Sequence, residues 1–404
     1  MITEFIKAVE TALIEIEKFN PREVTIFHHN DSDGLSSGAI LAETFRRKDF
    51  AVSMYCLEKP YPPLLKKIFE SDGKAIIFAD FAGRIAPLIS GLNRGRNLIL
   101  ILDHHVAEKS TDPRVFNLDP ELFGLKGDRD ISASTTCYIF SKVWDERNAD
   151  LSRMATIGAV GDGFFVDGKL VNANREAALE AERRGFIEIT ERDWGEEYIL
   201  VHVSTRTSCR EFGRYLDILG GVGYQEEGPA LAVEACLKGS SEKTDNLVRR
   251  LKAMRKEIFE REIKSLRSGA LEKTDHIQWF NMDSRFSPMG VKMVGIFCEE
   301  ISSMDFIDKD RYIAGFQVIP DLIPGFGKID IHHTKVSMRV PGHLRERIIS
   351  KEALGLDQLL PEATARLGGF SDACHSLTAA TVVEIGQEKE LIQEMEKILN
   401  SLRR

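Results

Sequence analysis

Three short apolar runs, each ending in acidic or histidine side chains, constrain the fold of this chain most strongly. They cover Val24–His29, Lys74–Asp80 and Asn97–Asp103, and stretches with helical spacing such as Leu35–Arg47 lie between them. Runs rich in Ile, Leu and Val that alternate with helices predict parallel strands buried on both faces. Ligands of such sheets gather at the carboxyl ends of the strands. We therefore expect an α/β fold whose polar run ends meet at one edge of the sheet.

The polar residues at these run ends are mainly carboxylates and imidazoles. They are His28, His29, Asp31 and Asp33 after the first run, Asp80 after the second, Asp103, His104 and His105 after the third, and Asp162 between two glycines after a fourth apolar segment. Carboxylates bind hard divalent ions, and imidazole shifts the preference toward Mn²⁺. With no cysteine in the set, a structural zinc site is disfavoured.

So many carboxylates at one sheet edge would repel each other unless cations neutralised them. Two metal ions about 3.5–4 Å apart would do so, and such pairs promote in-line attack on phosphorus. Asp80 is best placed to bridge them, and a shared water or hydroxide of lowered pKa would be the nucleophile.

Each motif alone has a simpler interpretation. Asp-Ser-Asp-Gly is typical of a turn or a helix N-cap, Asp80 could cap a helix, and Asp162 could belong to a turn. The tripeptide 103–105 is harder to explain in this way, because three polar residues at the end of an apolar run need solvent, a partner or a metal. Four such motifs in order favour a functional site.

Composition limits the class of protein. The 404 residues predict two or three domains at roughly 100–200 residues each. The net charge of 54 − 63 = −9 argues against nonspecific binding to long duplex DNA. The six cysteines are scattered without a CxxC pair, which favours a reducing cytoplasm. No signal peptide and no run of 18 apolar residues is visible, so we expect a cytoplasmic protein without a membrane span.

The domain boundaries follow from the pattern along the chain. We expect a catalytic domain over residues 1–239 (a core of 1–165 plus a helical extension), a connecting helix over 240–275 and a smaller α/β domain over 276–404. From Glu242 to Arg267 there are nine basic and five acidic residues, a balance of +4. This helix is either a solvated face or a surface that presents cations to a nucleic-acid backbone.

The motif set resembles the DHH phosphoesterase superfamily, which is named after the tripeptide at Asp103–His104–His105. Within it the chain is similar to the RecJ-like and nanoRNase-like branch that carries a C-terminal DHH-associated substrate domain. The resemblance covers residues 24–165 and about 276–385, and the middle matches least. It implies a mostly parallel, doubly wound N-terminal sheet, a connecting helix and a smaller C-terminal α/β domain.

The resemblance also implies two metal sites that share one carboxylate. The ligands would be His29, Asp31 and Asp80 for the first metal, and Asp33, Asp80, His104 and Asp162 for the second. His29 matches the RecJ-like pattern, in which a histidine lies two positions before the first aspartate. Other branches place it four before, where this chain has Phe27, so His28 stays a fallback ligand.

The same resemblance assigns supporting roles. Asp80, Asp103, His104 and His105 would be the catalytic set, with Asp103 orienting its neighbours and His105 beside the scissile phosphate as hydrogen-bond donor or general acid. The segment Asp130–Ser134 resembles the small-residue helix start that precedes the fourth motif. Its amides could bind a phosphate.

The C-terminal match is looser. Arg339 fits the basic strand position that would bind phosphate, Gly368 and Gly369 fit the glycine run, and Ala379–Ala380 fit a small-residue helix. His375, however, stands six residues past Gly369, whereas the family has histidine next to the glycines. His375 is therefore either a substrate residue or an ordinary loop histidine.

The leading hypothesis is a two-metal phosphodiesterase that uses Mn²⁺, with Mg²⁺ or Co²⁺ as alternatives, to remove nucleotides from an end of single-stranded DNA or RNA. One alternative is a nanoRNase or 3′-phosphoadenosine phosphate phosphatase that acts on very short substrates. Another is a replication scaffold that has lost catalysis, although such a protein should lack several ligands that are present here. A replication or repair protein and a second copy of the chain are candidate partners. Strand polarity and the choice between DNA and RNA stay open.

Overall fold

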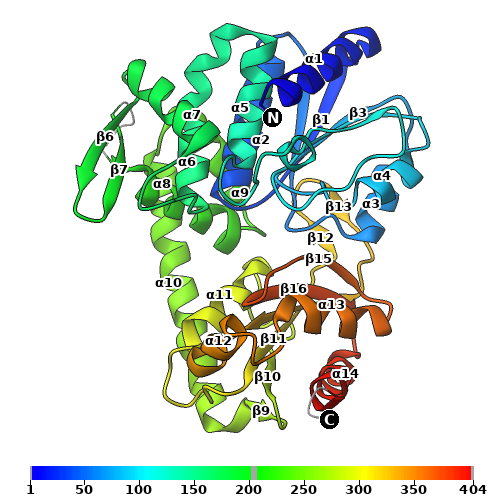
Figure 1. Ribbon diagram of the computed structural model, residues 1–404, viewed down its shortest axis with the longest axis vertical. Helices are drawn as coiled ribbons and strands as arrows, with labels where there is room; N and C mark the ends of the chain where they lie inside the picture. The colour runs from blue at the N-terminus through cyan, green and yellow to red at the C-terminus, as the bar shows by residue number, and fades with distance from the viewer. Residues whose placement is uncertain (1, 202–206, 402–404) are drawn as a thin grey trace. The chain divides into compact units, whose positions relative to one another are not determined.

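The computed structural model describes residues 2–201 and 207–401. The chain forms two compact units, Met1–Leu251 with Ile323–Gly327, and Lys252–Leu322 with Lys328–Arg404 (Figure 1). No helix in these described ranges is long and apolar enough to cross a membrane. All six cysteines are free thiols, as their scattered positions predict.

The first unit is built on a five-stranded sheet with the order β2-β1-β3-β4-β5, and every neighbouring pair is parallel. The strands are β1 (Glu23–His28), β2 (Ala51–Cys56), β3 (Ala75–Ala79), β4 (Leu98–Leu102) and β5 (Val115–Asn117). The three predicted apolar runs are β1, β3 and β4, and β3 and β4 are buried along their whole length. The predicted α/β class with a parallel N-terminal sheet is confirmed.

Helices surround this sheet. They are α1 (Ile2–Phe19), α2 (Ser32–Arg46), α3 (Pro62–Ile68), α4 (Ala86–Asn93), α5 (Ala133–Trp144), α6 (Ser152–Gly161) and α7 (Asn172–Arg183), with short helical turns at Pro120–Phe123 and Glu146–Leu151. Helix α2 packs against β1, α5 and α6, so it is buried on almost every side. A helix that is covered all round needs small or apolar residues, and α2 has both.

The sequence led us to expect a helical extension after this core, but the extension also contains strands. It contains an antiparallel sheet of β6 (Ile187–Arg192), β7 (Gly195–Leu200) and β8 (Thr207–Ser208). Helices α8 (Cys209–Asp217) and α9 (Gly228–Lys238) and a wide turn at Ile218–Val222 complete it. In Figure 1 the β6–β7 hairpin is the green arm beside α8.

The predicted connecting helix is α10 (Glu242–Ser265), followed by a turn at Leu266–Ala270. The second unit has a mixed six-stranded sheet with the order β15-β16-β14-β11-β10-β9. Its strands are β9 (Glu272–Lys273), β10 (Ile277–Asn281), β11 (Tyr312–Val318), β14 (His333–Arg339), β15 (Phe370–Cys374) and β16 (Thr378–Glu384). A small hairpin pairs β12 (Leu322–Ile323) with β13 (Gly327–Lys328).

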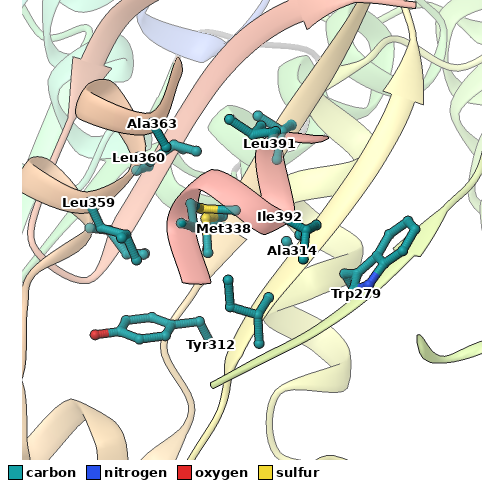
Figure 2. Close-up of a cluster of buried hydrophobic side chains, with 14 of the residues drawn as sticks. Trp279, Tyr312, Ala314, Met338, Leu359, Leu360, Ala363, Leu391 and Ile392 are labelled. Atoms are coloured by element: carbon teal, nitrogen blue, oxygen red, sulfur yellow. The ribbon is translucent and has the colours of Figure 1, made fainter. Parts of the chain in front are cut away.

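Helices α11 (Lys292–Ile301), α12 (Gly342–Ile349), α13 (Leu356–Arg366) and α14 (Glu388–Ser401) pack on this sheet. Figure 2 shows the buried cluster, in which Met338 of β14 lies among side chains of α13 and α14. Ala379 and Ala380 belong to β16, so the small-residue helix that we expected there is absent. The two residues are small, and small residues fit a covered strand as well as a helix.

Candidate metal centre

The strand order places a binding edge between β1 and β3. Strand β2 lies on one side of β1, and the chain then crosses to β3 on the other side of β1. Ligands of parallel sheets bind at the point where the strand order reverses in this way. The backbone N–H of His29 donates to the carbonyl oxygen of Ala79, and that of Asp80 donates to Leu102. These bonds extend the sheet by one residue, so the predicted ligands after β1, β3 and β4 start side by side.

Six predicted ligands lie in two groups at this edge. One group is His29, Asp31 and Asp80, and the other is Asp33, His104 and Asp162. Within each group the potential ligand atoms lie within 4.8 Å of one another. The first group has the three ligands that the family resemblance implies for one metal, and the second has three of the four implied for the other, without Asp80. A third group contains Asp80, Asp103, His104 and His105.

Asp80 connects the two groups. Its Oδ2 lies 3.3 Å from His29 Nδ1, and its Oδ1 lies 3.4 Å from His104 Nε2. The backbone of Asp80 is in the left-handed region with φ 68°, which turns the chain sharply at the end of β3. A carboxylate whose two oxygens face two different imidazoles is suited to bridge two cations.

Each of the two imidazoles turns one buried nitrogen toward the carboxylates. His29 Nδ1 and His104 Nε2 are buried and make no hydrogen bond with any residue that the structure describes. Carboxylate oxygens lie close by, at 2.8 Å from His29 Nδ1 (Asp31) and at 3.8 Å from His104 Nε2 (Asp162), but without hydrogen-bond geometry. Because a buried polar atom without a partner is costly, this nitrogen and oxygen set fits a divalent cation.

The pKa values of the potential ligands, in the absence of metal, reflect crowded negative charge. Burial and the nearby Asp80 raise the pKa of Asp33 to about 7. Burial lowers the pKa of His29, but Asp31 and Asp80 outweigh it and raise that pKa to about 9. The pKa of His104 is also raised well above its usual value, because the carboxylates Asp80, Asp162 and Asp33 outweigh burial. Protons therefore balance the carboxylates in the metal-free protein.

A backbone carbonyl orients His104. Its Nδ1 lies 2.6 Å from the oxygen of Gly127 and donates a hydrogen bond to it, so Nε2 is the nitrogen that a metal would bind after its proton leaves. Gly127 must be glycine, since a Cβ there would lie 1.5 Å from the carbonyl oxygen of His104. Sequence reasoning missed Gly127, because nothing in the segment around it indicates a contact with residue 104.

Asp103 organises the third strand end. Its Oδ1 accepts from the backbone N–H of His104 (2.8 Å) and lies 2.7 Å from His105 Nδ1, and its Oδ2 accepts from the N–H of Gly83 (2.8 Å). Burial raises the pKa of Asp103, but His105 and these donors hold it below its usual range. The side chain of His105 is 39% exposed, and its Nε2 is left available. Asp103 thus makes the contacts that suit the orienting role implied by the family resemblance.

Two helix starts hold the aspartates after β1. Asp31 caps α2 by accepting from the N–H of Gly34 (3.1 Å). Asp33 accepts from the N–H groups of Ala133 (2.8 Å) and Ser134 (3.1 Å) at the start of α5, where Ser132 is the N-cap. From the sequence, these amides could bind a phosphate. They bind Asp33 instead, since a helix N-terminus attracts a buried carboxylate as well as an anionic ligand.

His28 faces away from this centre. Its ring lies against α2, where a Cβ on Gly38 would come within 2.8 Å of it, and its Nδ1 is 2.9 Å from the carbonyl oxygen of His29. Burial lowers its pKa to about 4, so it is neutral. Of the two histidines, the geometry favours His29 as the ligand.

The predicted substrate residues of the second unit do not form one group. Arg339 lies opposite Thr378 in the sheet, and the N–H of His375 donates to the carbonyl oxygen of Thr378. Gly368 and Gly369 lie in the turn before β15, and Gly369 is close to Val382. Four residues of a strand separate Thr378 from Val382, or about 13 Å.

Arg339 itself is mostly buried and forms an ion pair. Its side chain is 20% exposed, and its Nε lies 3.0 Å from Glu299 Oε2 on α11. His375 is exposed in the turn between β15 and β16, which suits the simpler interpretation of a loop histidine.

No known protein-family profile matches the chain. An uncharacterized protein of Methanocaldococcus jannaschii is 30% identical over 173 residues, which is 41% of this chain and 38% of that protein.

Solved structures resemble nearly the whole chain. RecJ of Thermus thermophilus in complex with Mn²⁺ has a TM-score of 0.62 at 14% identity, with 98% of this chain and 55% of that chain covered. The DHH domain of a member of the s1p family of ribosomal proteins has a TM-score of 0.63 at 13% identity, covering 98% and 91%. CDC45 of Entamoeba histolytica has a TM-score of 0.59 at 9% identity, covering 98% and 99%. The chain thus spans about half the length of that RecJ.

Proposed function

From the premise that this chain has the DHH-domain fold with a DHH-associated-like C-terminal domain, we propose that it is a metal-dependent phosphoesterase that binds two divalent ions. The observation that carries the proposal is the position of Asp80, whose two carboxylate oxygens face His29 Nδ1 and His104 Nε2. The first ion would be held by His29, Asp31 and Asp80. The ligands of the second would be Asp33, Asp80, His104 and Asp162.

Mn²⁺ is the first choice for both positions. Mixed imidazole and carboxylate ligands suit it, and RecJ of Thermus thermophilus has been solved with Mn²⁺ and with Mg²⁺. When bound, such a pair of ions supplies a hydroxide nucleophile at neutral pH and neutralises charge on a phosphoryl group. The carboxylates that repel each other in the metal-free protein then have counter-ions.

His105 is the proton donor in this proposal. Burial and the nearby His104 lower its pKa, but Asp103 outweighs them and raises it above the usual value, which favours the protonated form of His105. Asp103 fixes the ring through Nδ1, which leaves the Nε2–H to hydrogen-bond a phosphate oxygen or to protonate the leaving oxygen. The 39% exposure of the side chain gives a substrate access to it.

The substrate that we propose is single-stranded DNA or RNA, from which nucleotides are removed at one end. Very short oligonucleotides or 3′-phosphoadenosine phosphate are the alternative. One observation favours the very short substrates: most cations of the segment from Glu242 to Arg267 are paired with carboxylates. The pairs are Lys243–Glu227, Arg250–Glu226, Arg255–Glu300, Lys256–Glu260, Arg261–Glu262 and Arg267–Asp305. Paired cations attract a phosphate backbone less, so this helix gives little support to long strands.

A catalytically inactive scaffold is the candidate of another class. The likeness to CDC45 is one of fold alone, at 9% identity. A complete set of potential ligands, with the nitrogens of His29 and His104 facing Asp80, argues against this candidate, which predicts no metal binding. A replication or repair partner and a homodimer are compatible with either function.

The experiment that tests the function is a Mn²⁺-dependent digestion. Single-stranded DNA and RNA, both long and of about two to five nucleotides, are labelled at either end and their products resolved over time. Stepwise release of mononucleotides from long strands supports the exonuclease and gives its polarity. Hydrolysis of only the shortest oligomers selects the alternative, and no hydrolysis of any substrate together with no bound Mn²⁺ contradicts the phosphoesterase.

A further inference from the structure

We propose that Phe165, Arg210 and Trp194 form a contact site for an unpaired nucleotide of a single-stranded nucleic acid, beside the metal centre. This inference rests on the proposed phosphodiesterase function and names part of its substrate-binding surface. All three residues belong to the first unit. Two of them come from the extension that the family resemblance explains least.

The guanidinium of Arg210 lies over two aromatic rings. Its Cζ lies 4.7 Å from the centroid of the Phe165 ring and 5.4 Å from that of the Trp194 ring. Trp194 stands at the turn between β6 and β7, the green hairpin of Figure 1, and is 53% exposed. An indole that is half exposed keeps surface on which a base can stack.

This stack is tied to the metal centre by a short loop. Phe165 follows the predicted ligand Asp162 by three residues, so their Cα atoms are at most about 11 Å apart. Between them, the ring of Phe164 lies edge-on to that of His104 with centroids 5.2 Å apart. The stack is therefore within a few nucleotides of the reacting phosphate in a bound strand.

The same loop is fastened to the hairpin. The N–H of Glu196 donates to the carbonyl oxygen of Gly168 at 2.9 Å. Gly168 has φ +76°, and a Cβ there would lie 2.3 Å from the carbonyl oxygen of Trp194. A larger residue would push the loop and the hairpin apart, so glycine keeps Trp194 at a defined place relative to Asp162.

The charge of Arg210 is not neutralised, unlike that of its neighbours. Arg192 pairs with Glu197, Lys169 with Glu191, and Arg175 with Glu196. Within residues 2–201 and 207–401, Arg210 forms no ion pair with a carboxylate and is exposed. Its Cζ lies over both rings, and its N–H donors lie in the guanidinium plane, where they can bind a phosphate.

These features together suit one ligand class. A nucleotide supplies a flat π-surface for the indole and a phosphate for the guanidinium. The base must be unpaired, because bases of a duplex are already stacked on each other. An acidic peptide would use Arg210 but gain nothing from Trp194, so the tryptophan distinguishes the two.

Binding of labelled single strands of about ten nucleotides, followed by fluorescence anisotropy in EDTA, tests the site without hydrolysis. We expect Trp194→Ala to weaken binding by roughly 5- to 150-fold, the range for loss of one stacked base. Trp194→Phe should retain most of the affinity. Arg192→Ala, which removes a paired cation from the same hairpin, is the matched control and should bind like the wild type.

Two further measurements, the salt dependence of Kd and the quenching of tryptophan fluorescence, decide the roles of Arg210 and Trp194. Arg210→Ala should reduce the dependence of log Kd on log salt concentration by about one phosphate contact. A nucleobase on the indole should quench tryptophan fluorescence in the wild type more than in Trp194→Phe. Binding by Trp194→Ala equal to that of the wild type, or equal losses in Trp194→Ala and Arg192→Ala, would overturn the inference. Stack-dependent binding without Mn²⁺-dependent hydrolysis would support the site while the proposed function fails.

Discussion

The Nδ1 atom of His104 lies 2.6 Å from the carbonyl oxygen of Gly127, 23 residues further along the chain. This bond decides which nitrogen of the imidazole faces Asp80 and Asp162. Because a Cβ on Gly127 would lie 1.5 Å from the backbone oxygen of His104, the residue that supports the imidazole must also lack a side chain.

Gly127→Ala should therefore displace the backbone at residue 127 and tilt His104 away from the metal position. We expect Mn²⁺ affinity to fall about 10- to 100-fold, as for other losses of a group that orients a ligand. Isothermal titration with Mn²⁺ measures this. Gly91→Ala is the matched control, since a Cβ there meets nothing within 4 Å. Equal Mn²⁺ affinity in the two variants would show that the Gly127 contact does not matter.

Asp80→Asn should remove the charge that the two predicted metal ions share. We expect fewer bound Mn²⁺ per chain and a loss of hydrolysis larger than the roughly 100-fold upper range for a supporting partner. The fold should survive, because the amide has nearly the same shape. Metal content by mass spectrometry and hydrolysis of an end-labelled strand are the measurements. Asp167→Asn, at an exposed position with φ 49°, is the control, and near-wild-type turnover by Asp80→Asn would defeat the two-metal proposal.

Mn²⁺ affinity should rise with pH. His29 has a pKa of about 9 without metal, so at pH 7 a proton must leave before its nitrogen can bind a cation. Each displaced proton makes affinity change about tenfold per pH unit below the pKa of the group that loses it, so the contribution of His29 to the rise should end near pH 9. Titration in buffers of different ionisation enthalpy counts the protons released. A Kd for Mn²⁺ that is constant between pH 6.5 and 9 would contradict this linkage.

The stability of the metal-free protein should change in the opposite direction. The raised pKa of His29 means that its contacts with Asp31 and Asp80 stabilise the fold fully below the ordinary value of 6.5, and that this contribution is lost as pH rises through about 9. Thermal unfolding in EDTA should show His29→Gln losing stability relative to the wild type at pH 6, with a smaller difference at pH 9. A difference that grows with pH would reverse the proposed sign.

Arg339 is proposed to bind a phosphate, and its pairing with Glu299 gives a test in two directions. Arg339→Ala should raise KM and leave kcat nearly unchanged. Glu299→Gln should lower KM, because it frees the guanidinium. Arg366→Ala removes a cation of the same unit that pairs with Glu362 and Glu394, and it should change neither constant. If Glu299→Gln and Arg366→Ala have the same KM, Arg339 does not contact the substrate.

Local pattern was enough to predict the centre of the first sheet. The runs that end at His29, Asp80 and Asp103 are the continuous apolar type that a strand covered on both faces requires, and β1, β3 and β4 lie where they predict. Edge strands β2 and β5 escaped prediction, since β2 is only partly buried and β5 has three residues. The prediction of a helix at Ala379–Ala380 was wrong, because small residues suit a covered strand as well as a helix.

By itself, the sequence determined which residues end the strands and hence which carboxylates and imidazoles could meet. These are local properties, because strand periodicity and helix starts depend on neighbours in the chain. Only the tertiary structure decided that His29 and not His28 faces Asp80, that Gly127 orients His104, and that the amides of Ala133 and Ser134 bind Asp33. Such contacts join residues up to about a hundred positions apart, and packing alone brings them together.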